Sequence, residues 1–194
     1  SQPGSFNARA AAMAALAAGL ALFPDDPAKL QLDSLARFRG VKRRQELLVS
    51  TPRLKVIEDF GHHPTALAET LQSIRARFPG HIIHAAFEPR SNTSRTKVLQ
   101  AAFMRALALA DEVYLGPVAR PEKLKAEERF DTEAVIQHLA TQGVDAYTAP
   151  TNGELLEIIA ENTAEETERP QLVVFFTNGS FDGIIGKFVK TAIG

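Results

Sequence analysis

From residue 45 to the end of the chain, short apolar runs alternate with stretches in which apolar residues recur every three or four positions. The runs are rich in Val, Ile and Phe and are bounded by Gly, Pro and polar residues, which predicts strands. We expect strands at residues 45–50, 54–60, 81–87, 112–115, around Ala146 and Tyr147, and at 171–177. The stretches between them have helical spacing. We expect helices at residues 64–78, 95–110, 132–142 and 154–162, and a last helix that begins near Gly183.

Apolar strands that alternate with helices are typical of a parallel sheet covered on both faces. We therefore predict an α/β fold, a Rossmann-like and mostly parallel sheet with helices on both faces. Only Thr-Pro-Arg separates 45–50 from 54–60, which favours a hairpin or two adjacent strands. Ligands of such sheets bind at the carboxyl ends of the strands. The loops to inspect therefore follow 54–60, 81–87, 112–115 and 171–177. We expect three of them, those after 54–60, 81–87 and 171–177, to face one shared cleft.

The first 40 residues have a different pattern. The alanine-rich stretch 10–23 predicts a tightly packed internal helix, because alanine is the best helix former but only weakly hydrophobic. The alternative is the apolar part of an export signal, but only Arg9 precedes it as a charge and no cleavage site follows. The stretch is also shorter than the roughly 20 residues of a membrane span. A turn and a short helix that ends near Phe38 come next.

Gly40 and the basic run 42–44 have the character of a hinge between domains. We expect residues 1–40 to be the tail of one domain, a short helical remnant, and residues 41–194 to form the next. Because nothing before the alanine-rich helix could cover it, we expect the chain to begin near the end of an upstream domain.

The composition of the chain excludes several classes of function. Lys and Arg number 22 against 23 Asp and Glu, so no global basic field favours nucleic acid or an anionic membrane as partner. The chain has no Cys, which excludes a disulfide framework, a thiolate metal site and a thiol nucleophile. This absence is compatible with a reducing cytoplasm, and we expect a cytoplasmic protein.

The loop 59–65 places an acid and two histidines at a strand end. Pro64 suits the first position of a helix, which puts His63 at the cap. The N-terminus of a helix attracts phosphate or ribose oxygens, and Asp59 could bond ribose hydroxyls or lie near a metal. The alternative is a polar capping loop without a ligand. A metal site on His62 and His63 is disfavoured, because adjacent side chains diverge.

The loop 88–95 holds two arginines among short polar side chains. This pattern suits a carboxylate-bearing ligand held by bidentate contacts. An equally open reading makes Thr93 or Ser94 the N-cap of the next helix and Arg95 a solvated residue of its first turn.

The loop 177–183 contains two glycines that allow a tight turn and leave Ser180 able to face a ligand. Its spacing to Lys187 does not match a phosphate-binding P-loop. The acidic run 161–168 predicts a solvated helix end.

Five segments together resemble the C-terminal region of the ATP-dependent Mur ligases of peptidoglycan metabolism. In chain order they are GSFNARAA, FRGVKRR, IEDFGHHPTA, FEPRSNTSR and VFFTNGSFDGI, and they cover nearly the whole chain. The resemblance implies a three-domain, ADP-forming ligase with a UDP-sugar domain, a central ATPase domain and a Rossmann-like C-terminal domain that closes over ATP. Residues 1–40 would be the tail of the central domain and 41–194 the C-terminal domain.

Within the family, the FEPRSNTSR segment favours a peptide ligase of peptidoglycan recycling. Such an enzyme joins UDP-N-acetylmuramate to the tripeptide L-Ala-γ-D-Glu-meso-diaminopimelate through an acyl phosphate. The alternatives are a ligase of free L-alanine and a non-catalytic nucleotide-binding module. The partners implied are these substrates and the upstream domains, with no nucleic acid and no membrane. We expect this chain alone to be inactive.

The resemblance also implies roles for particular residues. The implied ATP contacts are Asn7, Arg44, Asp59, His62 and His63, with the hinge arginine Arg44 and the ribose-side acid Asp59 as the catalytic pair. The implied peptide contacts are Arg90, Asn92, Arg95 and Ser180. Mg²⁺ would be held mainly upstream, so we expect no metal site here. The family usually has a His-Asn pair and a second Asn three residues after the first, where this chain has Phe6-Asn7 and Ala10.

Overall fold

The computed structural model describes residues 5–31, 33, 41–164 and 167–193, with side chains from residue 9 onward. The chain divides into two compact units, residues 1–42 and residues 43–194, and each is described by itself.

The first unit contains one long helix, α1 (Ser5–Leu22), and a 3₁₀ turn at Pro27–Lys29. The helix predicted at 10–23 is therefore confirmed, with an earlier start. The absence of a side chain at Gly19 lets the helix approach the turn, since a Cβ there would lie 2.8 Å from the carbonyl oxygen of Pro27. The tight packing we expected is not seen in the described residues, because Met13 and Leu22 are each 65% exposed. The short helix predicted to end near Phe38 lies outside the described residues, as does the side chain of Asn7.

In the described ranges, no helix combines the length and the apolar character that crossing a membrane requires.

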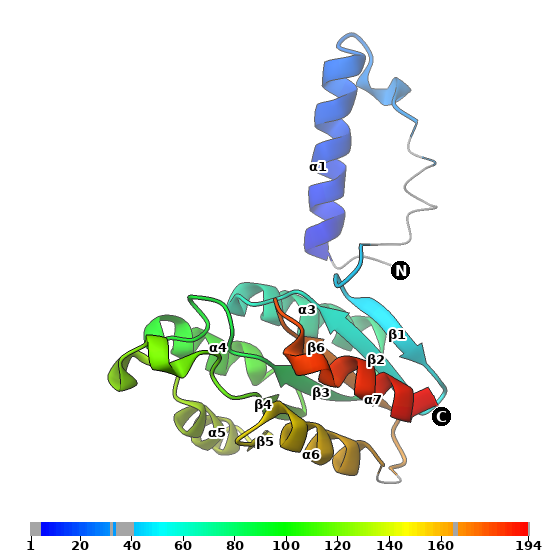
Figure 1. The fold of residues 1–194 in the computed structure, drawn as a ribbon. Helices are drawn as coiled ribbons and strands as arrows, with labels where there is room; N and C mark the ends of the chain where they lie inside the picture. The colour runs from blue at the N-terminus through cyan, green and yellow to red at the C-terminus, as the bar shows by residue number, and fades with distance from the viewer. Residues whose placement is uncertain (1–4, 32, 34–40, 165–166, 194) are drawn as a thin grey trace. The chain divides into compact units, whose positions relative to one another are not determined.

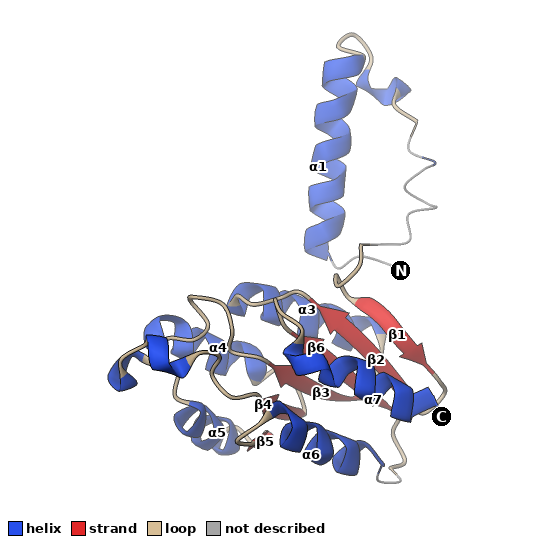
Figure 2. Ribbon diagram, viewed as in Figure 1, coloured by secondary structure: helices blue, strands red, loops and turns tan. Residues whose placement is uncertain are grey.

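The second unit is built on a six-stranded sheet (Figure 2). Its strands are β1 (Glu46–Ser50), β2 (Leu54–Asp59), β3 (Ile82–Phe87), β4 (Glu112–Leu115), β5 (Asp145–Thr148) and β6 (Gln171–Phe176). Their order across the sheet is β1-β2-β6-β3-β4-β5. β1 pairs antiparallel with β2, so of the two alternatives for this segment the hairpin is the one that forms, and all other neighbours are parallel. The last strand of the chain therefore lies between the second and the third.

Helices cover both faces of the sheet (Figure 1). One face carries α3 (Pro64–Arg77), α4 (Gln100–Leu107) and α5 (Thr132–Thr141), and the other carries α6 (Asn152–Ala164) and α7 (Ile184–Ile193). Side chains of one strand alternate between the two cores. In β6, for example, Val174 and Phe176 face the first core, whereas Val173 and Phe175 face the second. The predicted fold class is confirmed.

The helix predicted at 95–110 is shorter than expected. A 3₁₀ turn at Lys97–Leu99 precedes α4, which begins only at Gln100. The reason is that Thr96 has an extended backbone and forms an antiparallel bridge with Arg129, while the carbonyl of Arg95 accepts a hydrogen bond from the Phe130 N–H at 2.8 Å. The reading of Thr93 or Ser94 as a helix N-cap is therefore wrong.

Candidate functional site

The three turns that we expected to share a cleft leave the sheet side by side at one edge. Asp59, Phe176 and Phe87 are in register at the ends of β2, β6 and β3. Hydrogen bonds continue this ladder past the strand ends, from the Thr177 N–H to the Asp59 carbonyl (3.1 Å) and from the Glu88 N–H to the Phe176 carbonyl (3.0 Å). The turn after β6 therefore lies between the turn with the histidines and the turn with the arginines.

Asp59 lies behind the first turn and holds its backbone. Its side chain is buried, and its two oxygens accept hydrogen bonds from the N–H groups of Gln45 (2.9 Å) and Gly61 (2.7 Å). Burial raises the pKa of Asp59, and these two hydrogen bonds and the charge of Arg44 offset only part of that effect. Asp59 thus shapes the turn, and only a small part of it reaches the surface.

Phe60 is the centre of a group of cations and rings. The guanidinium carbons of Arg43 and Arg44 lie over its ring, 5.0 and 5.2 Å from the ring centre, and His62 meets it edge-on at 5.4 Å. Such contacts orient a guanidinium group without using up its hydrogen-bond donors. Arg44 is exposed, so its donors face outward at this edge.

The two histidines make different contacts. His63 is the N-cap of α3, where its Nδ1 accepts a long hydrogen bond from the Thr65 N–H (3.4 Å), and Pro64 occupies the first helical position as predicted. His62 is half-buried, with its Nδ1 3.0 Å from the Phe60 carbonyl oxygen. The capping reading of this loop is therefore correct for His63, and it does not conflict with a ligand at the exposed helix end.

Arg43 is a structural residue that the sequence reasoning missed. Its Nε donates to Glu58 Oε1 (2.6 Å), and its Nη2 donates to the carbonyls of Thr177 (2.8 Å) and Gly179 (2.5 Å). Because adjacent side chains diverge, the pair Arg43-Arg44 indicates that one arginine faces inward and the other outward. The sequence does not indicate which of the two faces inward.

Glu88 is a second residue that we did not single out. It is a buried carboxylate whose Oε2 accepts a short hydrogen bond from the Thr177 hydroxyl, and its Oε1 lies 3.4 Å from Nη1 of Arg90. The Arg90 guanidinium lies against the backbone of Gly179 and remains about one third exposed. The structure therefore brings Arg90 next to the turn that carries the exposed Ser180.

Arg95 and Asn92 form a separate pair. Arg95 is only 9% exposed, and its guanidinium bonds Asn92 Oδ1 (2.9 Å) and the carbonyl of Ala119 (3.2 Å). The reading of Arg95 as a solvated first-turn residue is wrong. In this structure it braces the loop after β4, and Asn92, which is exposed, is the member of the pair that a ligand can reach.

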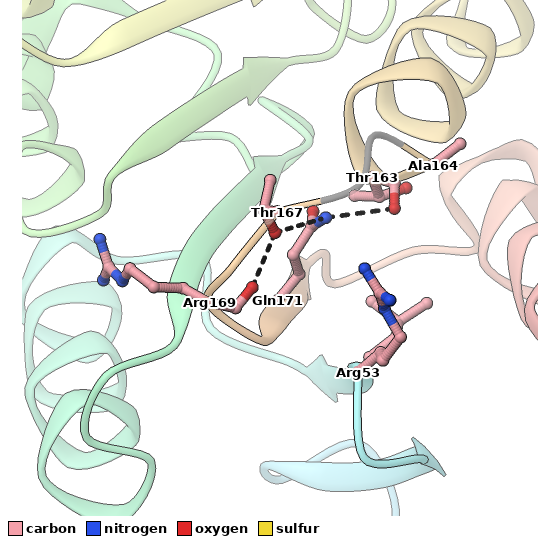
Figure 3. Close-up of a pocket in the computed structure, with 7 residues that line it drawn as sticks. Arg53, Thr163, Ala164, Thr167, Arg169 and Gln171 are labelled. Carbon is pink, nitrogen blue, oxygen red and sulfur yellow. Dashed lines mark hydrogen bonds between the residues drawn. The ribbon is translucent and has the colours of Figure 1, made fainter.

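A cavity of about 230 Å³ lies at the opposite edge of the sheet (Figure 3). It is lined by Arg53, Leu54, Thr163, Ala164, Thr167, Arg169 and Gln171. Its polar groups bond the protein itself: the Gln171 amide donates to the Thr163 carbonyl, and Arg169 donates to the carbonyls of Gly80 and His81. The carboxyl edge is therefore the better candidate for ligand binding.

Among the described residues, no group of three or more His, Asp or Glu side chains is placed to hold a metal ion.

Comparison with known proteins agrees with this arrangement. Residues 43–179 match the family model described as "Mur ligase, glutamate ligase domain". A UDP-N-acetylmuramate–L-alanine ligase of Koribacter versatilis is 34% identical over 163 residues, which are 84% of this chain and 34% of that protein. The crystal structure of a UDP-N-acetylmuramate–alanine ligase from Thermotoga maritima superposes with a TM-score of 0.70 at 25% identity, over 99% of this chain and 39% of that one.

A murein peptide ligase from Psychrobacter arcticus has the same fold, with a TM-score of 0.63 at 24% identity over 81% of this chain and 31% of that one. The chain spans about a quarter to a third of the length of the curated relatives it matches. The chain belongs to the Mur ligase family, whose members are ATP-dependent ligases.

Proposed function

We propose that this chain is the part of an ATP-dependent amide ligase that closes over the nucleotide and binds the acceptor amine, with UDP-N-acetylmuramate as the carboxylate substrate. The observation that carries the proposal is the meeting of three turns at one sheet edge. The turn after β6 lies between the turn that carries Arg90 and the turn after β2, where Arg44 packs over Phe60. We also propose that residues 1–40 are the tail of the central ATPase domain and that 41–194 are the C-terminal domain.

The nucleotide side of the site is the turn after β2. Arg44 is exposed and oriented by Phe60, and the N-terminus of α3 lies in the same turn behind His62 and His63. A guanidinium group and a helix N-terminus both favour phosphate oxygens. We assign Arg44 to the phosphates and the two histidines to the adenosine. Asp59 acts by holding the turn that presents them, and Asn7 would contact the nucleotide from the other domain.

The acceptor side is the turn after β3. Arg90 keeps donors exposed beside Ser180, and Asn92 is exposed next to the buried Arg95. The partly exposed guanidinium group of Arg90 and the short polar side chains beside it suit a ligand that carries carboxylates. This supports the tripeptide L-Ala-γ-D-Glu-meso-diaminopimelate as acceptor. Free L-alanine is the second candidate, because the relative from Koribacter versatilis is by name a UDP-N-acetylmuramate–L-alanine ligase.

The reaction that this arrangement serves has two steps. The sugar-linked carboxylate attacks the γ-phosphorus of ATP, which forms an acyl phosphate and releases ADP. The amine of the acceptor then attacks the acyl carbon, phosphate leaves, and the nitrogen loses a proton. The residues of this chain contribute by orienting the two reactants and by excluding water that would hydrolyse the acyl phosphate. The Mg²⁺ ligands would lie mainly in the upstream domain.

The test is an assay of the full-length protein with ATP and UDP-N-acetylmuramate, comparing tripeptide with L-alanine. We expect ADP release that depends on the tripeptide, and we expect this chain alone to release none. Arg90→Ala should lower kcat/KM for the tripeptide about 10- to 100-fold, since a charged hydrogen bond contributes about 1.5–3 kcal/mol.

Arg77→Ala is the matched control, because Arg77 lies in the last turn of α3 and contacts Phe78 instead of the site. Unchanged tripeptide kinetics in Arg90→Ala, or turnover with L-alanine alone, would contradict the acceptor assignment. Nucleotide binding without any turnover would contradict the ligase proposal as a whole.

A further inference from the structure

The side chain of Arg43 connects two parts of the site that are far apart in the sequence. It extends from the segment before β1 to the turn after β6, where one nitrogen donates to two carbonyls, those of Thr177 and Gly179. A second nitrogen donates to Glu58 on β2. β6 lies next to β2 (Figure 1). This order of strands brings the partners within reach of one guanidinium group.

Hydrogen bonds also fix the backbone on both sides of Arg44. Arg43 and Gln45 both have positive φ angles, 59° and 49°, a region that residues other than glycine seldom adopt. The N–H of Arg43 donates to Glu46 Oε2 (2.8 Å), and its carbonyl accepts from the Phe60 N–H (2.7 Å). The N–H of Gln45 donates to Asp59. Arg44, which lies between these two residues, is thereby fixed in direction and faces outward over Phe60.

The turn after β6 is held from its other side by different groups. The Gly179 N–H donates to the Thr177 hydroxyl (2.9 Å), which donates to the buried Glu88. Arg90 bonds the same carboxylate and lies against Gly179. The turn 177–179 therefore has Arg43 on its β2 side and the pair of Glu88 and Arg90 on its β3 side.

We propose that Arg43 is a positioning residue that couples the nucleotide side of the site to the acceptor side. It does so by tying the segment that presents Arg44 to the turn that presents Ser180. Order imposed on one of these segments is transmitted to the other, so that nucleotide and acceptor each strengthen the binding of the other, as thermodynamic linkage requires. We call the hydrogen bonds of Arg43 to Thr177, Gly179 and Glu58 the tie. The tie is present whichever ligands bind, whereas the coupling between ligands rests on the proposed function.

Lysine cannot replace arginine in this position. The planar fork of arginine reaches the two carbonyls and the carboxylate at once, whereas an ammonium group on a flexible stem is a single point of contact. Arg43→Lys therefore keeps the charge and removes the tie. Arg44→Ala is the matched control, because it removes the neighbouring arginine, which lies over the same Phe60 ring, and leaves the Arg43 contacts in place.

The first test is amide hydrogen exchange in the chain of 194 residues. We expect exchange at residues 178–180 to become about tenfold faster in Arg43→Ala and Arg43→Lys than in Arg44→Ala, since hydrogen bonds from a charged group are lost. Exchange in β3 and α5 should stay unchanged, which excludes general unfolding. Equal exchange at 178–180 in the Arg43 and Arg44 variants would overturn the tie.

The second test uses the full-length ligase and measures the KM for ATP at low and at saturating acceptor. In the unmodified enzyme we expect the acceptor to lower this KM, and in Arg43→Lys we expect the two values to converge while the kcat at saturation changes less. An acceptor effect that is fully retained in Arg43→Lys would overturn the coupling. A full-length protein without ligase activity would instead refute the proposed function and leave the exchange result standing.

Discussion

The guanidinium group of Arg90 occupies the space that a side chain at position 179 would fill. A Cβ built on Gly179 would overlap Nε and Cδ of Arg90, so the contact exists only because residue 179 is glycine. The glycine of this turn is therefore required by the neighbouring turn, since its own φ angle is not among the positive ones.

We expect Gly179→Ala to displace Arg90 and to raise the KM for the acceptor about tenfold, with a smaller effect on the KM for ATP, because Arg90 belongs to the acceptor side. Steady-state kinetics of the full-length enzyme measure both constants. Gly186→Ala is the matched control: nothing lies within 4 Å of its added Cβ, and it sits inside α7. There the same substitution should stabilise the fold by about 0.5–1 kcal/mol. Equal acceptor kinetics in both variants would contradict this role of Gly179.

Thr177→Val should destabilise the chain by about 1–3 kcal/mol. The hydroxyl of Thr177 accepts from the Gly179 N–H and donates to the buried Glu88, so valine leaves both groups without this partner. Urea denaturation followed by circular dichroism gives the free energy of unfolding. The matched control is Thr191→Val on the exposed face of α7, which should change this free energy by less than about 0.5 kcal/mol. Equal stabilities of the two variants would show that the buried hydroxyl contributes nothing.

Asp59 should titrate above its ordinary value of 3.8, because burial raises its pKa more than its hydrogen bonds and Arg44 lower it. The folded-state pKa then exceeds that of the unfolded chain, so this group contributes stability that is present below 3.8 and is lost as the pH rises through the folded-state pKa. Removing the Arg44 charge should raise the pKa of Asp59 further. Carbon-13 NMR titration of the Asp59 carboxyl in unmodified protein, Arg44→Ala and the control Arg77→Ala measures this. A lower pKa in Arg44→Ala would contradict the prediction.

Phe60→Leu should weaken nucleotide binding about twofold to fivefold. The ring orients Arg44, and a cation–π contact at a surface contributes about 0.5–1 kcal/mol. Phe78→Leu is the matched control, since Phe78 carries a similar contact with Arg77 (4.9 Å) at the far end of α3. The KM for ATP of the full-length enzyme distinguishes the two. A larger effect of Phe78→Leu would mean that Arg44 is not presented by this ring.

Local pattern was sufficient for most elements of the second unit. The apolar run of β6 and the spacing of Leu67, Leu71 and Ile74 in α3 predicted a strand and a helix that the structure confirms. The sequence also predicts Pro64 at the first helical position, because the N–H that proline lacks would have no partner within the helix there. The carboxyl edge of the sheet followed from the strand–helix alternation, since parallel strands all end at the same side.

Other features depend on contacts that no local pattern contains. The segment 91–96 has polar residues suited to a helix start, yet residues 91–95 form turns, and Thr96 is extended and bridged to Arg129. The burial of Arg95 likewise depends on the loop after β4, which reaches it from 24 residues away. In both cases the local preference of the sequence is overridden, because a hydrogen-bonded partner from elsewhere in the chain stabilises another conformation.

The alternation of apolar and polar residues in this chain is enough to define an α/β sheet, its carboxyl edge and the turns at that edge, because strand and helix periodicities are local properties. It does not say that β6 lies between β2 and β3. That order places Arg43 against carbonyls 134 and 136 residues away and leaves Arg44 facing outward, although the two residues are chemically identical. Which arginine turns inward depends on partners that only the folded chain brings together.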